Sequence, residues 1–290
     1  ATKTDNPSIM YGFDGNDSIT GNIGKDTIFG GAGNDTIVGG ASSDTVSGGA
    51  GIDKFVYNAL VGTTSDSNGE DGKVDTITDL ELTDFIYLNL TNVNNYVLQN
   101  VVFGDATRYV SYNDGDGAAY GQGDVYILTS VVGFTTAQAQ SMTVINAVGT
   151  TGGDIISGGV NNDTITGAAG ADSLTGGAGA DTFVFAAGDS SESSMDVITD
   201  FNSSEDLLSV RAIVPGHAWG LINLGTLASY ADVKAAAASY ISTDSWPVVG
   251  NDGSNTWVFL DNGHNSSLDA GDTVIQLTGV ITTLTNAHFV

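Results

Sequence analysis

The sequence predicts an all-β fold in which two coiled arrays of parallel strands are each followed by antiparallel strands, with little helix. Three observations predict it. A nine-residue unit occurs five times from Gly12 and four times from Gly149. A strand–loop–strand segment follows each array. The composition combines 40 Gly with 41% hydrophobic residues, which is too apolar for a disordered acidic chain and too rich in glycine for an ordinary core.

The nine-residue unit keeps three positions constant. From Gly12 the chain reads GFDGNDSIT, GNIGKDTIF, GGAGNDTIV, GGASSDTVS and GGAGIDKFV, and from Gly149 it reads GTTGGDIIS, GGVNNDTIT, GAAGADSLT and GGAGADTFV. The first residue is always Gly, the sixth is always Asp and the eighth is always large and apolar. The glycines allow the first half of each unit to turn, and the last three residues predict a short strand. The chain should therefore coil into two thin parallel sheets with the apolar side chains inside.

Stacked coils bring the sixth-position carboxylates together. Successive turns form two rows in which neighbouring Asp residues lie about 5 Å apart, the spacing of strands in a sheet. Without a cation such a row is repulsive. Calcium takes about six to eight hard oxygen ligands, which a turn of backbone carbonyls and one Asp from each neighbouring turn can supply. We therefore expect several Ca²⁺ ions.

These units resemble the RTX (repeats-in-toxin) calcium-binding nonapeptide repeat, GGxGxDxUx. The resemblance implies parallel β-rolls in which carbonyls of the first and third positions and the sixth-position Asp bind calcium. In the first array the implied ligands are Gly12, Asp14, Asp17, Gly21, Ile23, Asp26, Gly30, Ala32, Asp35, Gly39, Ala41, Asp44, Gly48, Ala50 and Asp53. In the second array they are Gly149, Thr151, Asp154, Gly158, Val160, Asp163, Gly167, Ala169, Asp172, Gly176, Ala178 and Asp181.

Some units depart from the repeat. Asp14 adds a carboxylate near the first turn, and a solvated turn residue is the alternative interpretation. Ser42 replaces the fourth-position glycine. Thr150 and Thr151 replace the usual residues at the start of the second array, so we expect weaker calcium binding in that turn.

Both arrays are followed by a D-x-I-x-D segment, at Asp75 and Asp79 and again at Asp196 and Asp200. The resemblance implies that this segment closes each roll and that its acids cap the last calcium site. A polar strand with solvated acids is the alternative.

A second pair of similar segments follows, at residues 109–128 and 257–277, each a strand, an acidic glycine-rich loop and a strand. In the second loop Asp261, Asn265, Asp269 and Asp272 weakly resemble a calcium loop, without the flanking helices or final Glu of an EF-hand. A plain hairpin loop is the alternative.

We interpret the chain as a tandem duplication. Residues 1–147 comprise a roll at 12–57 and a β-rich segment, and residues 148–290 comprise a roll at 149–185 and a β-rich segment. One helix is predicted, over Tyr230–Tyr240, where Ala, Lys and Asp stand in helix-favouring order.

The charge excludes several function classes. The chain has 34 acidic and 7 basic residues and a formal net charge of −27, which excludes nucleic acid and anionic membrane surfaces as partners.

The chain has no Cys, and its three His residues, His217, His264 and His288, lack metal-ligand spacing. No apolar stretch is long enough for membrane insertion. The sequence lacks the nucleophile-elbow, zinc-helix and phosphate-loop motifs of enzymes, so we expect no catalytic site.

Acidic calcium repeats couple folding to metal binding. As RTX proteins are exported unfolded by type I secretion, the resemblance implies a chain that folds in extracellular calcium. We therefore expect a secreted bacterial calcium-binding structural protein of the cell surface that self-assembles into a homopolymer, such as an S-layer, an extracellular filament or a matrix. A cell-surface glycan is an open further partner. The alternative is the C-terminal folding and secretion domain of a larger toxin, adhesin or hydrolase.

Overall fold

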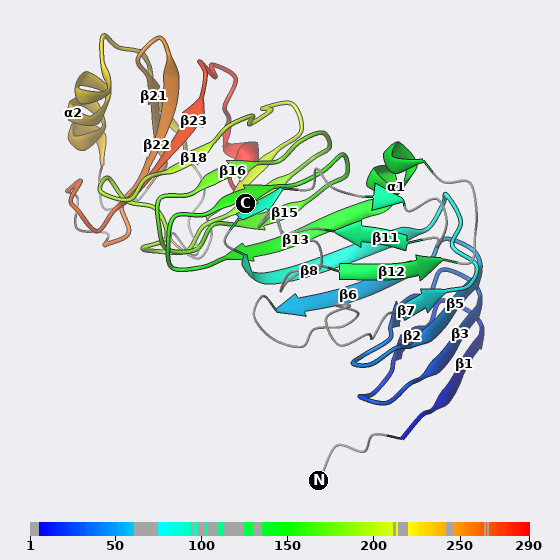
Figure 1. The fold of residues 1–290 in the computed structure, drawn as a ribbon. Coiled ribbons are helices and arrows are strands. Elements are labelled where there is room, and N and C mark those ends of the chain that lie inside the picture. Colours follow the sequence, from blue (N-terminus) through cyan, green and yellow to red (C-terminus); the bar gives the residue numbers. More distant parts are fainter. Residues whose placement is uncertain are drawn as a thin grey trace. The chain divides into compact units, whose positions relative to one another are not determined.

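The computed structural model describes residues 6–60, 75–93, 95–97, 102–103, 109–112, 125–129, 135–210, 213, 220–241, 246–263, 265 and 267–290. The chain divides into two compact units, residues 1–147 with 159–161 and residues 148–158 with 162–290. In each unit a coil of parallel strands leads into antiparallel strands (Figure 1). The prediction of an all-β fold with parallel β-rolls and little helix is confirmed.

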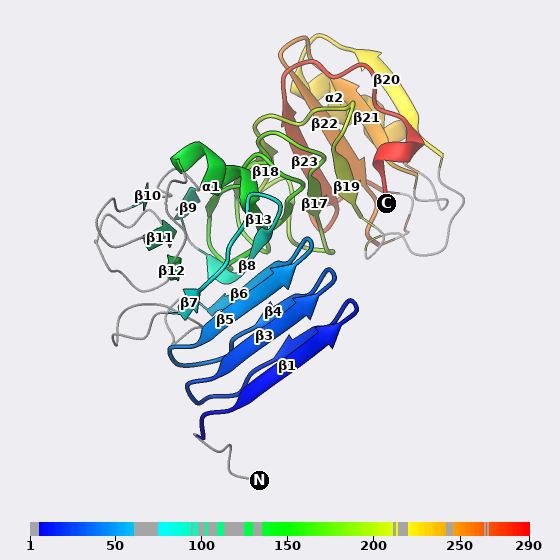
Figure 2. The same cartoon turned by 90° about the vertical axis from the view of Figure 1, so that its right-hand side faces the viewer.

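The coil of the first unit alternates between two parallel sheets. One sheet runs in the order β1 (Ile9–Asp14), β3 (Thr27–Ala32), β5 (Thr45–Ala50) and β7 (Asp75–Ile77). The other runs in the order β2 (Ser18–Thr20), β4 (Thr36–Val38), β6 (Lys54–Leu60), β8 (Phe85–Val93) and β13 (Thr143–Gly149). Strands β1, β3 and β5 lie side by side in Figure 2. The coil thus extends beyond the expected limits 12–57, because β1 begins at Ile9, before Gly12, and β7 and β8 add a final turn.

The eighth-position residues form the interior of this coil. Ile28, Ile37, Val46 and Phe55 are each at most 2% exposed. They meet there because side chains of a strand alternate between its two faces, and each three-residue strand directs its middle residue inward. Beyond the repeats, β12 (Val125–Thr129) pairs in parallel with β7, and β11 (Tyr109–Tyr112) and β10 (Val102–Phe103) continue that sheet antiparallel. Strand β9 spans Asn95–Val97.

The second unit repeats this plan. One sheet contains β14 (Ile155–Ser157), β16 (Ser173–Thr175) and β18 (Asp196–Ile198), and the other contains β15 (Thr164–Thr166), β17 (Thr182–Val184) and β19 (Leu207–Ser209). The interior residues Ile156, Ile165, Leu174 and Phe183 are fully buried. This coil also passes its expected limit at residue 185, because β18 and β19 complete it.

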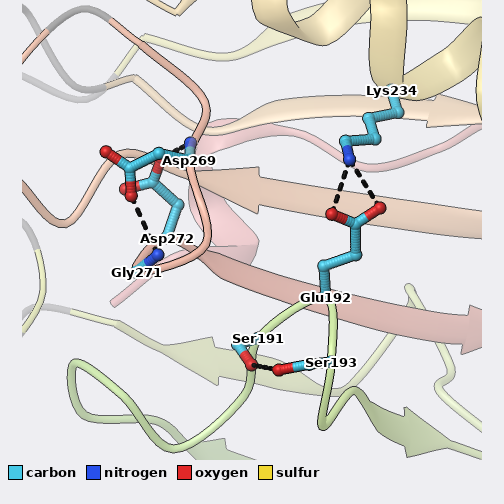
Figure 3. A network of polar contacts seen from close by, with 7 residues as sticks. All are labelled: Ser191, Glu192, Ser193, Lys234, Asp269, Gly271 and Asp272. Carbon is cyan, nitrogen blue, oxygen red and sulfur yellow. Dashed lines mark hydrogen bonds and ion pairs between the residues drawn. The ribbon is translucent and has the colours of Figure 1, made fainter.

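Further strands and a helix extend the second unit. Strand β23 (Thr273–Thr278) pairs in parallel with β18, and β22 (Asn255–Leu260), β21 (Val248–Asn251) and β20 (Ile222–Thr226) follow in the sheet. The predicted helix is confirmed as α2 (Tyr230–Tyr240), whose N-cap Ser229 accepts the N–H of Asp232. It buries Val233 and Ala237 against β21–β23. On its polar side Lys234 forms an exposed ion pair with Glu192 at 2.5 Å (Figure 3).

Two short helical segments were not predicted. Helix α1 (Thr136–Met142) has a capping box formed by Thr135 and Gln138, but its seven residues leave too short a pattern to recognise. The second segment is the 3₁₀ helix η1 (Asn286–His288). No helix within the described part of the chain has the length and apolar character needed to cross a membrane.

Six of the nine units have left-handed backbone at the second and fourth positions, and none has it at the first. In one turn Gly31 and Gly33 have φ of 122° and 131°. Residues with a Cβ occupy the same conformation elsewhere, with φ of 113° at Ser42 and 67° at Ala168. For these residues the left-handed region costs about 1–2 kcal/mol.

Replacing Ala168 by Gly should therefore stabilise the second unit by about 1 kcal/mol, because the strain exceeds the entropy that glycine adds to the unfolded chain. Thermal unfolding in saturating calcium measures the effect. The control is Ala171→Gly in the same turn, whose φ is not positive, and which should lower the melting temperature. A loss of stability in Ala168→Gly as large as in the control would contradict the strain argument.

Candidate metal centre

The sixth-position aspartates form hydrogen-bonded rows along the first coil. In each row the N–H of one Asp donates to the Oδ1 of the Asp one full coil later, at distances of 2.7–3.0 Å. The two rows are Asp17–Asp35–Asp53–Asp84 and Asp26–Asp44–Asp75. Each carboxylate is thereby held against the backbone of the preceding coil, as the repeat spacing predicts.

The second unit contains the same arrangement. Its rows are Asp154–Asp172–Asp196 and Asp163–Asp181–Asp206, with N–H to Oδ1 distances of 2.8–2.9 Å. These residues are at most 3% exposed. The two coils therefore present equivalent lines of buried carboxylates.

Six of these carboxylates have a second oxygen that the protein leaves unsatisfied. The Oδ2 atoms of six residues are buried and have no hydrogen-bond partner: Asp17, Asp35, Asp53, Asp172, Asp181 and Asp196. A buried carboxylate oxygen without a partner is costly. In two turns, at Asp26 and Asp154, the Oδ2 instead accepts a backbone N–H at 2.6 Å.

The first-position glycines border the same space. A Cβ built on Gly12 would lie 2.6 Å from the Oδ2 of Asp17 and closer still to the carbonyl oxygen of Gly30. The corresponding contacts at Gly158 are with Asp163, at 2.5 Å, and with the Gly176 carbonyl. The first residue must therefore be Gly to leave room between a carboxylate and a carbonyl, since its backbone is not left-handed.

This donor set fits calcium. An unsatisfied carboxylate oxygen and a carbonyl oxygen facing one space are the hard ligands that Ca²⁺ prefers. Among the described residues, no group of three or more Asp, Glu or His side chains converges as a metal site, so carbonyls must complete the coordination. When bound, calcium supplies the positive charge that the row lacks.

The structure supports first-position carbonyls more directly than third-position ones. The carbonyls of Ala32 and Ala50 already accept the N–H groups of Gly15 and Gly33 at 2.7 and 2.8 Å. Each keeps a second lone pair. Calcium binding by the third-position carbonyls therefore stays a prediction.

Burial and mutual repulsion raise the pKa values of the carboxyls in the second unit. Burial, the largest cause, raises the pKa of Asp172 to about 6, of Asp181 to about 7 and of Asp196 to about 8. Backbone N–H donors oppose the shifts, whereas the neighbouring carboxylates of Asp154 and Asp163 add to those of Asp172 and Asp181. A bound cation would remove this penalty.

The D-x-I-x-D segments lie at the ends of the rows. Asp75 and Asp196 take the place of sixth-position residues. Asp79 accepts the N–H groups of Gly48 and Gly49 at 3.0 and 2.8 Å, and Asp200 accepts those of the corresponding glycines of the last repeat at 2.9 and 2.8 Å. These contacts favour a closing role over solvated acids.

Two members of the rows were missed in the sequence. Asp84 and Asp206 end one row in each unit and use both oxygens, because Glu81 and Asn202 donate their N–H groups to the second one. Both stand in turns without the repeat's glycines. The signal that could have found them is the part of the repeat that these turns keep, an Asp that precedes a buried apolar residue by two positions.

The remaining acidic positions do not join the rows. Asp14 is exposed at the end of β1, which favours a solvated turn residue. In the β22–β23 loop, Asp272 accepts the N–H group of Asn262. It also accepts that of Asp269, and Asp269 accepts that of Gly271 (Figure 3). These internal hydrogen bonds favour a plain hairpin loop. The corresponding loop at 113–124 lies outside the described residues.

Comparisons with known proteins agree with this site. Residues 11–46 and 20–55 match the family model of the RTX calcium-binding nonapeptide repeat, a unit of four copies. This chain carries RTX calcium-binding repeats. Residues 124–244 match the model of the peptidase M10 serralysin C-terminal region. Together these RTX features mark an extracellular calcium-binding protein of the type I secretion kind, and both models describe non-catalytic regions.

No curated protein matches this chain. Among solved structures, a subunit of the Azotobacter vinelandii mannuronan C5-epimerase is 24% identical, with 43% of this chain and 73% of that chain covered and a TM-score of 0.28.

Replacing Gly30 by Ala should weaken calcium binding in its turn by about 10- to 100-fold, the usual cost of disturbing the surroundings of a metal ligand. The new Cβ would contact the Asp35 carboxylate and the Gly48 carbonyl. Calcium titration calorimetry measures the loss. The control is Gly152→Ala, where the nearest atom is the Oγ1 of Thr150 at 3.6 Å. Unchanged binding in Gly30→Ala would contradict the proposed ligand space.

The raised pKa values predict opposite pH dependences with and without calcium. In chelator, lowering the pH from 8.5 to 5.5 should raise the melting temperature of the second unit, because carboxyls whose folded pKa exceeds the unfolded value stabilise the fold once protonated. In saturating calcium the same change should lower it, since protons compete with the ion. Calorimetric scans test both, and identical slopes in the two conditions would argue against buried carboxylate ligands.

Proposed function

We propose that this chain is an extracellular structural protein that folds on binding calcium and then self-assembles into a homopolymer at the cell surface, as an S-layer, filament or matrix. The observation that carries the proposal is the set of buried carboxylate oxygens without partners along both coils. Each is a local penalty that calcium removes, so the folded state depends on the ion.

The coupling of folding to calcium binding explains how one chain can be exported unfolded and then form a folded structure outside the cell. Where free calcium is scarce, a chain with net charge −27 repels itself and its rows stay unsatisfied. In millimolar extracellular calcium, each independent site would stabilise the fold by about 2.7 kcal/mol at a hundredfold excess over its dissociation constant. Several such sites suffice to convert an unfolded chain into a folded one.

Self-assembly is supported by the exposed face of the first strand. Strand β1 pairs on one side only within the described residues. Its outward residues Ile9, Tyr11 and Phe13 are 67%, 58% and 72% exposed. Tyr11 stacks on Phe13 and on Phe29 of β3, with ring centroids 5.9 and 5.1 Å apart. An open strand edge with an apolar face is a site for pairing with another chain, and we assign it to a second copy.

A second candidate function rests on the match of residues 124–244 to a serralysin C-terminal region. This match favours a calcium-dependent folding and secretion domain of a larger secreted toxin, adhesin or hydrolase. The exposed β1 face would then contact the rest of that protein. In neither case do we assign a catalytic role to this chain, and a glycan partner stays open.

A calcium titration of the chelated chain, followed by circular dichroism and light scattering together, separates the two functions. We expect β signal at micromolar to millimolar calcium and, at the same concentrations, large particles. In Ile9→Ser/Tyr11→Ser, folding should persist while the protein concentration needed for assembly rises at least about tenfold, since each of these large side chains contributes about 2 kcal/mol of burial.

The control is Leu82→Ser, an exposed apolar residue away from β1, which should assemble as the unmodified chain does. Folding without particles would favour the secretion domain. A chain that is already folded in chelator and ignores calcium would refute both.

A further inference from the structure

We call a turn closed when its second residue donates its backbone N–H to the Oδ2 of its sixth-position Asp, as happens in two turns of the repeats. In the turn of Asp26, the second-position residue Asn22 donates its N–H to the Oδ2 of Asp26 at 2.6 Å, and its side-chain oxygen accepts the N–H of Gly24 at 2.8 Å. In the turn of Asp154, Thr150 does the same, with an N–H to Oδ2 distance of 2.6 Å and a Gly152 N–H to Oγ1 distance of 3.1 Å.

Five other turns are open, in that the Oδ2 of their sixth-position Asp has no hydrogen-bond partner. Their second-position residues, Phe13, Gly31, Gly49, Ala168 and Gly177, all have positive φ, between 67° and 122°. In each of these turns the Oδ2 of the sixth-position Asp is buried and unpartnered. The N–H of the second residue points elsewhere, as at Gly49, which donates to Asp79, and Gly177, which donates to Asp200.

In these seven turns the side chain at the second position accounts for the difference. Asn and Thr carry an oxygen that can accept the N–H two residues later, which stabilises a turn whose second residue does not have positive φ. Glycine has no such oxygen and accepts the left-handed conformation freely. The same closed pattern occurs outside the repeats, where Asn202 donates its N–H to Asp206 and accepts that of Ser204.

We propose that in these seven turns the second residue decides whether the turn takes calcium. Turns with a left-handed second residue bind an ion on the free Oδ2, whereas the turns of Asn22 and Thr150 close on their own carboxylate and bind none. The turns of Asp26 and Asp154, each at the start of a row, are thereby satisfied without metal, next to turns that are not. The inference rests on the calcium sites proposed above and is independent of self-assembly.

The test counts calcium ions per chain by titration calorimetry, with the full chain stripped by chelator. Thr150→Gly should open its turn and add one ion, and Asn22→Gly should do so independently in the other unit. Thr150→Ser keeps the hydroxyl and should leave the count unchanged. Ala171→Gly, a new glycine at the fifth position of an open turn, should also leave it unchanged. In chelator, the two opened variants should melt at lower temperature than the unmodified chain.

Two carboxylate variants separate the failure of this inference from the failure of the sites. Asp181→Asn, in an open turn, should remove one ion, whereas Asp154→Asn, in a closed turn, should remove none. A count that does not fall in Asp181→Asn would overturn the proposed calcium sites themselves. A count that falls by one in Asp154→Asn, or folded opened variants that gain no ion, would overturn the inference while leaving the sites in place.

Discussion

The structure depends on the contact between the backbone N–H of one aspartate and the carboxylate of another, one coil later. This contact places a charged group inside the protein at every turn, and it orients that group so that one oxygen is held and the other points into a narrow space beside a glycine. A neutral side chain could make the same hydrogen bond but would supply no negative charge to a bound cation. The repeat thus combines a structural and a ligand role in one residue, and folding and metal binding become a single process.

Glycine serves the turns in two different ways. At the second and fourth positions it supplies left-handed backbone, which Ser42 and Ala168 also adopt at a cost. At the first position it supplies space, because any Cβ would fill the place between a carboxylate and a carbonyl. The first position is therefore glycine in every repeat, whereas the second and fourth vary, and their variation changes the turn without breaking the coil.

The described ends of the two coils differ. In the first unit, the strand β1 has an open edge and an exposed aromatic face. In the second unit, the C-terminal tail covers β19, with Val290 donating to Leu208 at 3.0 Å and accepting from Val210 at 2.9 Å. A covered edge cannot pair with another chain, whereas an open apolar one can. Association through β1 is consistent with this difference.

The sequence by itself determined the repeat, its strands, its buried apolar positions and the rows of aspartates, because each depends on a local pattern of period nine that the backbone must satisfy in every coil. It also indicated helix α2 through its composition. Only the tertiary structure decided which oxygens stay free, because that depends on the φ of a second-position residue and on donors from another coil. It also placed Asp84 and Asp206 in the rows, since their turns lack the glycines and only contacts distant in sequence reveal their position.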